Sequence, residues 1–417
     1  MLVLASACAS GNVAPGTAAT ATSRSTVLGS TATTGTVAAP TASTFAVTTA
    51  VTSTVTSTPT TSATTASTPV SPSTTSTTVT VAPTSTTPPP FVACPETPSR
   101  LQDVSASSDA APEFDAPTAV DVRTLPARGV YVDPYGPAAN ALANELDERG
   151  KAVESRLATV PTAFTVGDFL GDKVTSEVQR ITTGASAAGQ MAVLQIYNLP
   201  YRDIGGGFSA GGASNADEYR AFTETVATAI GNRAALIILE PDSLGQMRSL
   251  SNQRQFERYL LLNEAVDRYG KLPNARVYLD GTHCGWLPAE LMAQRLLRAG
   301  VGRAQGFFTN VANYQPTDAE LSRARSISEL TGGTHFVVDT GRNGNGSYPG
   351  VLRNRWCNPP GRALGALPTL VTNEPLADAF LWIKAPGASD GTCGRGNPPA
   401  GTFWTERAVE LATNAGW

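Results

Sequence analysis

Residues 236–244 read LIILEPDSL, and this stretch contains the pattern that decides the fold. The run LIIL is too short for a core helix and is rich in β-branched residues, so it indicates a buried strand. Two carboxylates, Glu240 and Asp242, follow it almost at once. A polar residue after a strand can also simply mark the start of a loop. This segment therefore indicates a functional site only if other strands of the chain show the same pattern.

Six further apolar runs repeat the pattern, at residues 130–132, 193–196, 277–279, 306–308, 336–338 and 380–383. Between them, amphipathic spacing predicts helices over residues 215–231, 253–269 and 317–330, with Asn215 and Thr317 as N-caps and Gly231 as a stop. Alternating strands and helices indicate a parallel sheet with helices outside it. We therefore expect an α/β fold, a distorted, TIM-like parallel β/α barrel of about seven strands. An open doubly wound sheet is the alternative.

Polar residues follow every one of these runs. They are Asp133, Tyr197, Asp203, Glu240, Asp242, Asp280, Asn310, Asp339, Lys384 and Asp390. Barrel enzymes build their sites at the C-terminal ends of the strands. Seven such positions in register, several of them carboxylates, are best explained by a shared pocket.

Several classes of chemistry lose support from the residues that are missing. The chain has only two histidines, His283 and His335, and no spacing typical of a His/Cys metal cluster. No Walker-type or dinucleotide-binding glycine loop follows a strand, and no Gly-x-Ser-x-Gly elbow occurs. We therefore expect neither a metal nor a cofactor. Paired carboxylates are what glycoside hydrolysis requires, and isolated tryptophans suit stacking on sugars.

Eight segments resemble, in the same order, the family 6 glycoside hydrolases, the cellulase family of endoglucanases and cellobiohydrolases. They are VYVDP (130–134), IYNLPYRD (196–203), ILEPDSL (238–244), YLDGTHCGW (278–286), TNVANY (309–314), HFVVDTGRNG (335–344), WCNPPG (356–361) and FLWIKAPGASDGTC (380–393). The resemblance implies a distorted barrel of about seven strands, hydrolysis of β-1,4-glucosidic bonds with inversion, and a bacterial endoglucanase type.

The resemblance also implies a role for each matching residue. Asp242 matches the general acid, and Asp203 the carboxylate that raises the pKa of that acid. Tyr197 matches the tyrosine that favours a distorted sugar ring, and Ser209 the serine that holds the hydrolytic water. Asp390 matches the proposed base, a role that a water chain to Asp203 could also fill. Sugar-contacting or site-supporting positions match Trp286, Trp356, Lys384, His283, Asn310 and Asp280.

Each assignment has a structural alternative. Asp242 in a Pro-Asp-Ser sequence is also compatible with a helix N-cap, and Asp203 with an ion pair to the neighbouring Arg202 or to another arginine. Trp286 and Trp356 are also compatible with positions in the hydrophobic core, because tryptophan is often buried. His283 is compatible with a sugar contact or with a packed structural role.

The sequence departs from the family at Ala388, where members commonly carry glutamate, so we expect Lys384 to lose a carboxylate partner. Ile204 stands where many members have a disulfide cysteine. Together with the long N-terminal segment, Ala388 leaves an alternative function open. The alternative is a surface-displayed glucan-binding protein with reduced or no catalytic activity.

Residues 1–95 consist mainly of Thr, Ser, Ala, Val and Pro, with Arg24 as their only charged residue. Such a composition cannot bury enough apolar surface to fold, so we interpret residues 11–95 as a disordered linker and residues 110–417 as the catalytic domain. Residues 1–10, MLVLASACAS, resemble the remnant of a signal peptide or of a lipoprotein signal with Cys8 as the lipid anchor. We expect a secreted, extracellular protein, with anchoring at the cell surface as the alternative.

Cysteines and charges complete the expectations. Cys357 and Cys393 both lie in loops near predicted site residues and are expected to pair; Cys94–Cys284 is compatible with the sequence but not required by it. No Lys/Arg cluster suits nucleic acid. The resemblance to family 6 implies β-glucan as the partner, and the protein is expected to be a monomer.

Two loops predict whether the glucan is cleaved at internal bonds or from its ends. In this family, exo-action is associated with long loops that roof the cleft after the positions of Asp203 and Asp390. Here residues 204–214 and 391–403 are short and rich in glycine and small residues. We therefore expect an open cleft and cleavage of internal bonds.

Overall fold

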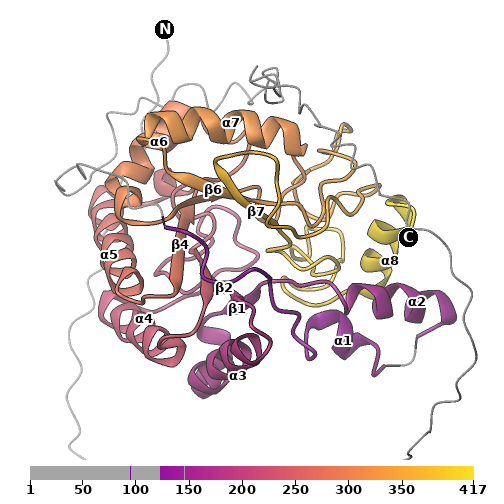
Figure 1. Ribbon diagram of the computed structural model, residues 1–417. Coiled ribbons are helices and arrows are strands. Elements are labelled where there is room, and N and C mark those ends of the chain that lie inside the picture. The colour runs from indigo at the N-terminus through magenta and orange to yellow at the C-terminus, as the bar shows by residue number, and fades with distance from the viewer. Residues whose placement is uncertain (1–93, 95–122, 145) are drawn as a thin grey trace, which may run out of the picture. The chain divides into compact units, whose positions relative to one another are not determined.

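The computed structural model of the chain describes Cys94, residues 123–144 and residues 146–417 (Figure 1). The predicted leader, Cys8 and the Thr/Ser-rich segment up to residue 93 lie outside the described residues. Within the described part, no helix has the length and apolarity needed to cross a bilayer.

Seven parallel strands form a single sheet, in which every strand pairs with the next strand along the chain. They are β1 (Phe164–Val166), β2 (Ala192–Ile196), β3 (Ala235–Leu239), β4 (Ala275–Asp280), β5 (Gly306–Thr309), β6 (His335–Asp339) and β7 (Ala377–Leu381). The sheet curls so that Ala163, before β1, donates a backbone hydrogen bond to Trp382, after β7, at 3.0 Å. The predicted distorted barrel is confirmed.

Helices connect the strands and lie around the outside of the curled sheet (Figure 1). They are α1 (Pro137–Ala141), α2 (Glu148–Leu157), α3 (Val174–Ala187), α4 (Ala216–Ile230), α5 (Asn252–Gly270), α6 (Ala289–Arg298), α7 (Thr317–Leu330) and α8 (Thr405–Asn414), with the short 3-10 helices η3 (Asp168–Lys173), η4 (Met247–Ser249) and η5 (Val301–Arg303). Asn215 caps α4 as predicted, because its side chain accepts the Glu218 N–H at 3.0 Å. The predicted cap at Thr317 is wrong: Thr317 is the first residue of α7, and its hydroxyl accepts from Asn343 instead.

Alternate strand residues pack into two different cores. Leu194, Ile237 and Val277 face the helices and belong to the larger core. Val193 and Ile238 face the other way and belong to a smaller core inside the barrel. Because both faces of a parallel sheet are covered, its strands are apolar throughout, which is why the strand pattern was legible in the sequence.

The first predicted strand is wrong. In the run at residues 130–132, Val130 forms only an isolated bridge with Met191, immediately before β2. The true first strand, β1, pairs with the later residues of β2, so the run at 130–132 and β1 lie along the same edge. β1 has only three residues, two of them half-buried, and such a short segment gives little periodic signal.

Two disulfides connect distant segments of the described chain. Cys357–Cys393 is present as predicted and joins the long β6–β7 connection to the loop after β7. Cys94–Cys284, which the sequence left open, joins Cys94 to the loop after β4. The cysteine at the end of the predicted linker is therefore covalently attached to a wall of the barrel.

Candidate active site

Asp203 and Ser209 are held together by the loop that follows β2. The Asp203 side chain is 8% exposed and accepts backbone N–H groups from Gly206 at 3.1 Å and from Ser209 at 2.6 Å. The glycine-rich loop thus folds around the carboxylate, because small residues allow backbone N–H groups to approach it closely. Ser209 is half-buried, and its backbone N–H fixes it next to Asp203.

Arg202 does not pair with Asp203. Its guanidinium binds Asp168 at 2.6 Å and the backbone oxygen of Ser209 at 2.8 Å, and it lies over the ring of Tyr197 with its central carbon 4.9 Å from the centroid. The ion-pair alternative for Asp203 is therefore wrong for this arginine. Burial and the negative charges of Asp242 and Asp203 raise the pKa of Tyr197 well above its usual value, so the ring keeps its hydroxyl proton.

Asp242 lies in the turn after β3, where its backbone oxygen accepts the N–H of Gln246 at 3.0 Å. The next helical segment begins only at Met247, so Asp242 is not a helix N-cap. Its side chain is partly exposed, and among the described residues none donates a hydrogen bond to it. Burial, followed by the charges of Asp280 and Asp203, raises the pKa of Asp242 well above its usual value. Its proton is therefore released at a higher pH than that of an ordinary aspartate, and the carboxyl group remains available to a ligand.

Asp280 supports the turn that carries Asp242 from behind. It is 1% exposed and accepts the backbone N–H groups of Leu244 at 2.9 Å, Gly245 at 3.2 Å and Thr282 at 2.8 Å. Burial raises its pKa, although these backbone donors oppose the shift. The structure gives Asp280 a supporting place and not an exposed one.

His283 and Trp286 form the wall beside this turn. Their ring centroids are 5.3 Å apart, and both side chains are half-buried. Trp286 packs against Gly245, where a Cβ atom would lie 2.7 Å from the indole. Burial lowers the pKa of His283 to about 4, so its ring is neutral, with Nδ1 2.7 Å from the Cys284 oxygen.

Asn310 is buried beneath the site. It is 0% exposed, and its amide nitrogen donates to the backbone oxygens of Asp339 at 2.9 Å and Gln315 at 3.2 Å. Its amide oxygen accepts the Gln315 N–H at 3.1 Å. Asn310 thus fixes the loop after β5, and no polar atom of its side chain reaches the surface.

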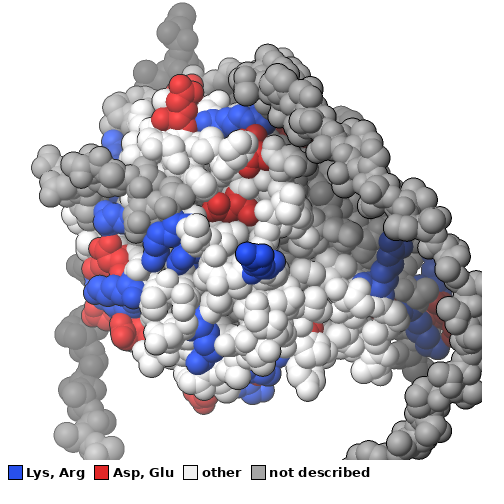
Figure 2. Space-filling view, viewed as in Figure 1, with Lys and Arg blue, Asp and Glu red and all other residues white. Residues whose placement is uncertain are grey.

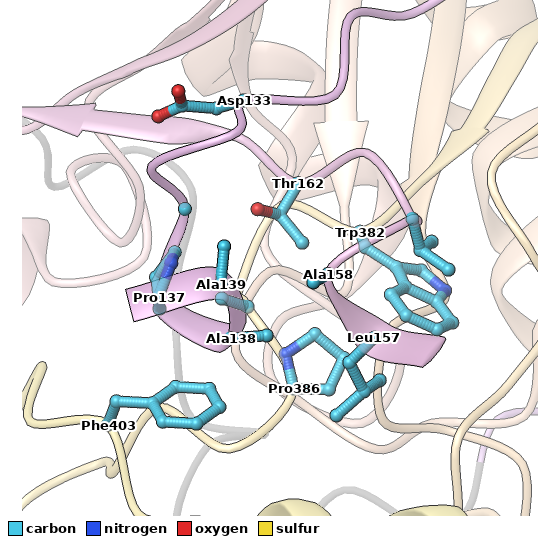
Figure 3. Close-up of a pocket in the computed structure, with 13 residues that line it drawn as sticks. Asp133, Pro137, Ala138, Ala139, Leu157, Ala158, Thr162, Trp382, Pro386 and Phe403 are labelled. Carbon is cyan, nitrogen blue, oxygen red and sulfur yellow. The ribbon is translucent and has the colours of Figure 1, made fainter. Parts of the chain in front are cut away.

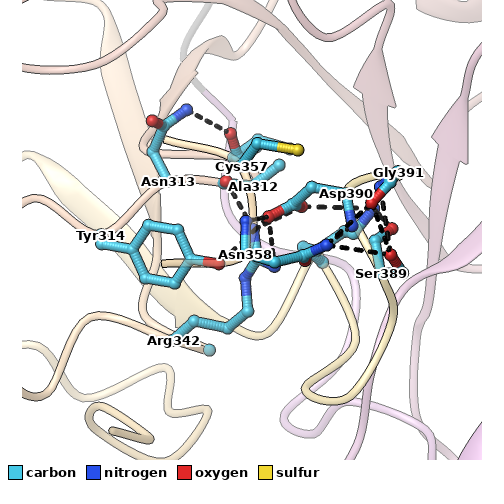
Figure 4. Close-up of polar contacts among 12 residues, drawn as sticks. Ala312, Asn313, Tyr314, Arg342, Cys357, Asn358, Ser389, Asp390 and Gly391 are labelled. Carbon is cyan, nitrogen blue, oxygen red and sulfur yellow. Dashed lines mark hydrogen bonds and ion pairs between the residues drawn. The ribbon is translucent and has the colours of Figure 1, made fainter. Parts of the chain in front are cut away.

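Asp390 lies at the centre of a dense ionic network (Figure 4). Arg342 contacts both of its oxygens, at 3.0 and 3.1 Å. The Tyr314 hydroxyl donates at 3.1 Å and the Asn358 N–H at 2.9 Å. Burial alone would raise the pKa of Asp390, but Arg342 and Lys384 outweigh it and the pKa is lowered. Asp390 is therefore a fully bound anion.

Lys384 keeps a carboxylate partner despite the alanine at position 388. Its ammonium group lies 3.8 Å from Asp390 and donates to the Ser389 backbone oxygen at 3.1 Å. Ala388 offers Lys384 no carboxylate, as expected, but Asp390 remains as a carboxylate partner in the described structure. Burial lowers the pKa of Lys384, and the charge of Asp390 opposes the shift.

Trp356 marks where two loops meet. It is 38% exposed, and its ring lies 5.9 Å from that of Phe208, in the loop after Asp203. Phe208 also packs on Gly391, where a Cβ atom would lie 2.6 Å from that of Phe208. The short loops at 204–214 and 391–403 therefore touch at this point. A core position for Trp356 is wrong, because more than a third of it is exposed.

Strained backbone marks the same strand ends. Of the eleven described residues other than glycine that have positive φ, seven lie in the connections that follow β2 to β5, including Asp203 (52°), Glu240 (54°), Asp242 (67°), Thr282 (57°) and Asn310 (65°). Such conformations cost of order 1–3 kcal/mol each and persist where surrounding structure enforces them, often at functional sites. The strain lies where the sequence predicted the pocket.

A small cavity lies apart from these carboxylates, between α1, the end of α2 and the residues after β7 (Figure 3). Its volume is about 20 Å³, enough for one water molecule. Asp133 lines it but is held by Arg180 at 2.7 Å. Asp133 is thus a structural ion-pair partner, although it follows an apolar run in the sequence.

Several residues of the site were missed by the sequence analysis, because their roles depend on contacts across the barrel. Arg342, in the segment HFVVDTGRNG, binds Asp390. Gln246 donates to Asp203 at 3.2 Å. Glu320 of α7, whose pKa burial raises to about 7, accepts the Cys284 N–H at 2.6 Å and supports the wall of His283 and Trp286.

Surface charges do not gather into a basic area on the face seen in Figure 2. Lysines and arginines there are scattered among acidic and uncharged residues.

A curled parallel barrel with an aspartate of raised pKa at a strand end, a second carboxylate that contributes to this shift, and tryptophan rings at the rim has the features of a glycoside hydrolase. The family model for glycosyl hydrolases family 6 matches residues 125–415. The chain belongs to this family, and the resemblance found in the sequence is confirmed.

Characterised relatives agree with this assignment. The chain is 40% identical over 291 residues to Endoglucanase A of Thermobispora bispora and 40% identical over 296 residues to Endoglucanase A of Cellulomonas fimi. These matches cover 68% and 70% of this chain and 62% of each relative. The endoglucanase Cel6 from Mycobacterium tuberculosis, solved with a thio-linked cellobioside derivative, is 44% identical, with a TM-score of 0.66; the match covers 70% of this chain and 98% of that one.

Proposed function

We propose that this protein hydrolyses internal β-1,4-glucosidic bonds of cellulose or related β-glucans with inversion, using Asp242 as the general acid. The environment of Asp242 carries the proposal. Its side chain is partly exposed and accepts no hydrogen bond from the described residues, and burial together with the charges of Asp280 and Asp203 raises its pKa. A general acid near neutral pH needs a carboxyl that keeps its proton until the substrate arrives.

The remaining roles are those that the family resemblance implies, and the contacts around each residue are compatible with them. Asp242 donates its proton to the departing glycosidic oxygen as the bond to the anomeric carbon breaks. Asp203, close enough to raise the pKa of Asp242, stabilises the positive charge that develops on the sugar. In this proposal Tyr197, which retains its hydroxyl proton, favours a distorted sugar ring, and Ser209 holds the water that attacks the opposite face.

The acceptor of the water's proton is better assigned to Asp203 than to Asp390. Asp390 is bound by Arg342 through both oxygens, and its lowered pKa makes it a weak base. We infer that the proton passes through water to Asp203. Asp390 instead anchors Lys384 and Asn358, and with them the loops that shape the site.

Exposed or half-buried groups at the rim are the proposed sugar contacts. Trp286 and Trp356 offer flat rings, and His283 and Lys384 offer polar atoms. Asp280 and Asn310 act indirectly, because both are buried and hold the loops in place. A β-glucan chain is therefore bound by aromatic faces and oriented by a small number of polar groups.

Internal cleavage is favoured by two observations. The loops after Asp203 and Asp390 are short, although they touch at Phe208. The relatives of 36–40% identity are named endoglucanases, whereas those named cellobiohydrolases are 29–32% identical. Such names, together with the two disulfides, also favour a secreted enzyme. The glucan-binding alternative gains no support, since Lys384 keeps its partner.

The experiment is hydrolysis of barley β-glucan, with reducing ends measured over time and the fresh product followed by proton NMR. The expected result is release of reducing sugar with the α-anomer appearing first. Initial β-anomer would exclude inversion. Binding without release of reducing ends would favour the glucan-binding function.

A further inference from the structure

Gln246 touches both aspartates that the proposed mechanism uses. It follows Asp242 by four residues and is 8% exposed. Its backbone N–H donates to the backbone carbonyl oxygen of Asp242 at 3.0 Å, and its side-chain Nε2 donates to Oδ1 of Asp203 at 3.2 Å. One residue thus connects the turn after β3 with the carboxylate after β2.

The other donors to Asp203 come from its own loop. These are the backbone N–H groups of Gly206 and Ser209, both on the glycine-rich segment that follows it. Within the described structure, Gln246 is the donor to Asp203 that belongs to a different strand connection. Its position is enforced by packing: a Cβ atom at Gly205 would lie 3.3 Å from the Gln246 side chain.

We propose that Gln246 is a positioning residue that fixes the Asp203 carboxylate relative to the turn carrying Asp242. This inference rests on the proposed function. The loop around Asp203 is rich in glycine, so its own backbone donors would move with it. The bond from Gln246 ties the carboxylate to the β3 side of the site and sets the separation between the two aspartates.

The chemistry of an amide suits this task. Nε2 can only donate, so it matches an ionised carboxylate, and the group does not titrate. A glutamate of the same length would place another negative charge between Asp203 and Asp242 unless it were protonated. The contact therefore persists over the whole pH range in which the site works.

The test compares Gln246→Met and Gln246→Glu with the wild type on barley β-glucan. Methionine keeps the length and removes the donor, so kcat should fall about tenfold with KM unchanged, as for an interaction used in the transition state. Gln246→Glu should lose more at neutral pH and recover as the pH falls, because only a protonated glutamate can donate to Asp203. A merely structural role would not move the pH profile.

Gln255→Met is the matched control. Gln255 is a buried glutamine of the same region, and its amide donates to the backbone oxygens of Met247 and Leu250, not to an aspartate of the site. The control should lower the thermal midpoint and leave kcat and its pH profile unchanged. If Gln246→Met fails to fold, the pH profile of Gln246→Glu carries the test.

Three results would overturn the inference. They are a kcat for Gln246→Met within twofold of the wild type, a loss confined to KM, and a Gln246→Glu profile parallel to that of the wild type. An active wild type with any of these results leaves the proposed function standing. An inactive wild type would overturn both proposals together.

Discussion

Replacing Asp242 with asparagine exchanges an acidic OH group for an NH2 group and changes the shape of the side chain very little. Asparagine has nearly the shape of a protonated aspartate and cannot donate a proton to a departing oxygen. In the structure the Asp242 carboxyl has no hydrogen-bond donor among the described residues that the change would disturb. The variant should therefore fold like the wild type and lose the acid.

The size of the effect follows from the role. General acid catalysis typically contributes about 10²–10⁴-fold, which corresponds to roughly 2.7–5.4 kcal/mol of transition-state stabilisation. The variant, although less active, should be at least as stable as the wild type at neutral pH. Burial raises the pKa of Asp242, so ionising this group costs the folded state more than the unfolded state. The loss of unfolding free energy that the wild type suffers as pH rises through that pKa should be absent in the variant.

The assay measures kcat of the variant and the wild type on two substrates and compares their thermal midpoints. On barley β-glucan, kcat of Asp242→Asn should fall by the factor above. On a cellobioside with a dinitrophenyl leaving group, which departs without a proton, the loss should be less than about tenfold. The thermal midpoint at pH 7 should equal or exceed that of the wild type.

Near wild-type activity of a folded Asp242→Asn protein on β-glucan would refute the assignment of the acid. Equal losses on both substrates would show that Asp242 acts through charge or structure and not through its proton. A lower thermal midpoint at pH 7 would contradict the account of the raised pKa.

Three further results are expected. The viscosity of carboxymethylcellulose should fall early relative to reducing ends released, whereas dominant cellobiose with little viscosity loss would indicate a closed cleft. Removing residues 1–93 should leave kcat and the thermal midpoint nearly unchanged. Removing residues 1–95 also deletes Cys94 and should lower the midpoint, because closing a loop of 190 residues stabilises the fold by about 5 kcal/mol in the chain-entropy model. Burial raises the pKa of Glu154, on α2, from 4.5 to about 7, so the unfolding free energy of the wild type should fall as pH rises across that range. In Glu154→Gln this fall should be smaller by about 1–2 kcal/mol after allowance for solvent screening, as measured by urea unfolding at pH 5 and 8.

The sequence was most informative where secondary structure alone determines position. Parallel strands bring their C-terminal ends together, so Tyr197, Asp203, Asp242 and Asp390 could be predicted as neighbours before any contact was known. α4 was predictable to the residue, because Asn215 and Gly231 have local roles at its two ends.

What could not be predicted depends on depth and on contacts across the barrel. Asp280 and Asn310 have the same sequence signature as Asp242, a polar residue after a strand, yet they are buried and bind backbone groups. Only the three-dimensional path of the loops separates a carboxylate that supports a turn from one that faces a ligand. Arg342 was invisible for the same reason, because its partner lies 48 residues away.

The Cys94–Cys284 disulfide determines where mechanical load enters the protein. Any pull on the chain before Cys94 passes through this bond into the loop after β4, and not along residues 95–122. Cys284 lies between His283 and Trp286 in the sequence, and its N–H is held by the buried Glu320 of α7. If the N-terminal segment tethers the enzyme while the barrel holds a glucan chain, tension between tether and substrate would therefore enter the barrel at the loop that carries His283 and Trp286, the proposed sugar contacts.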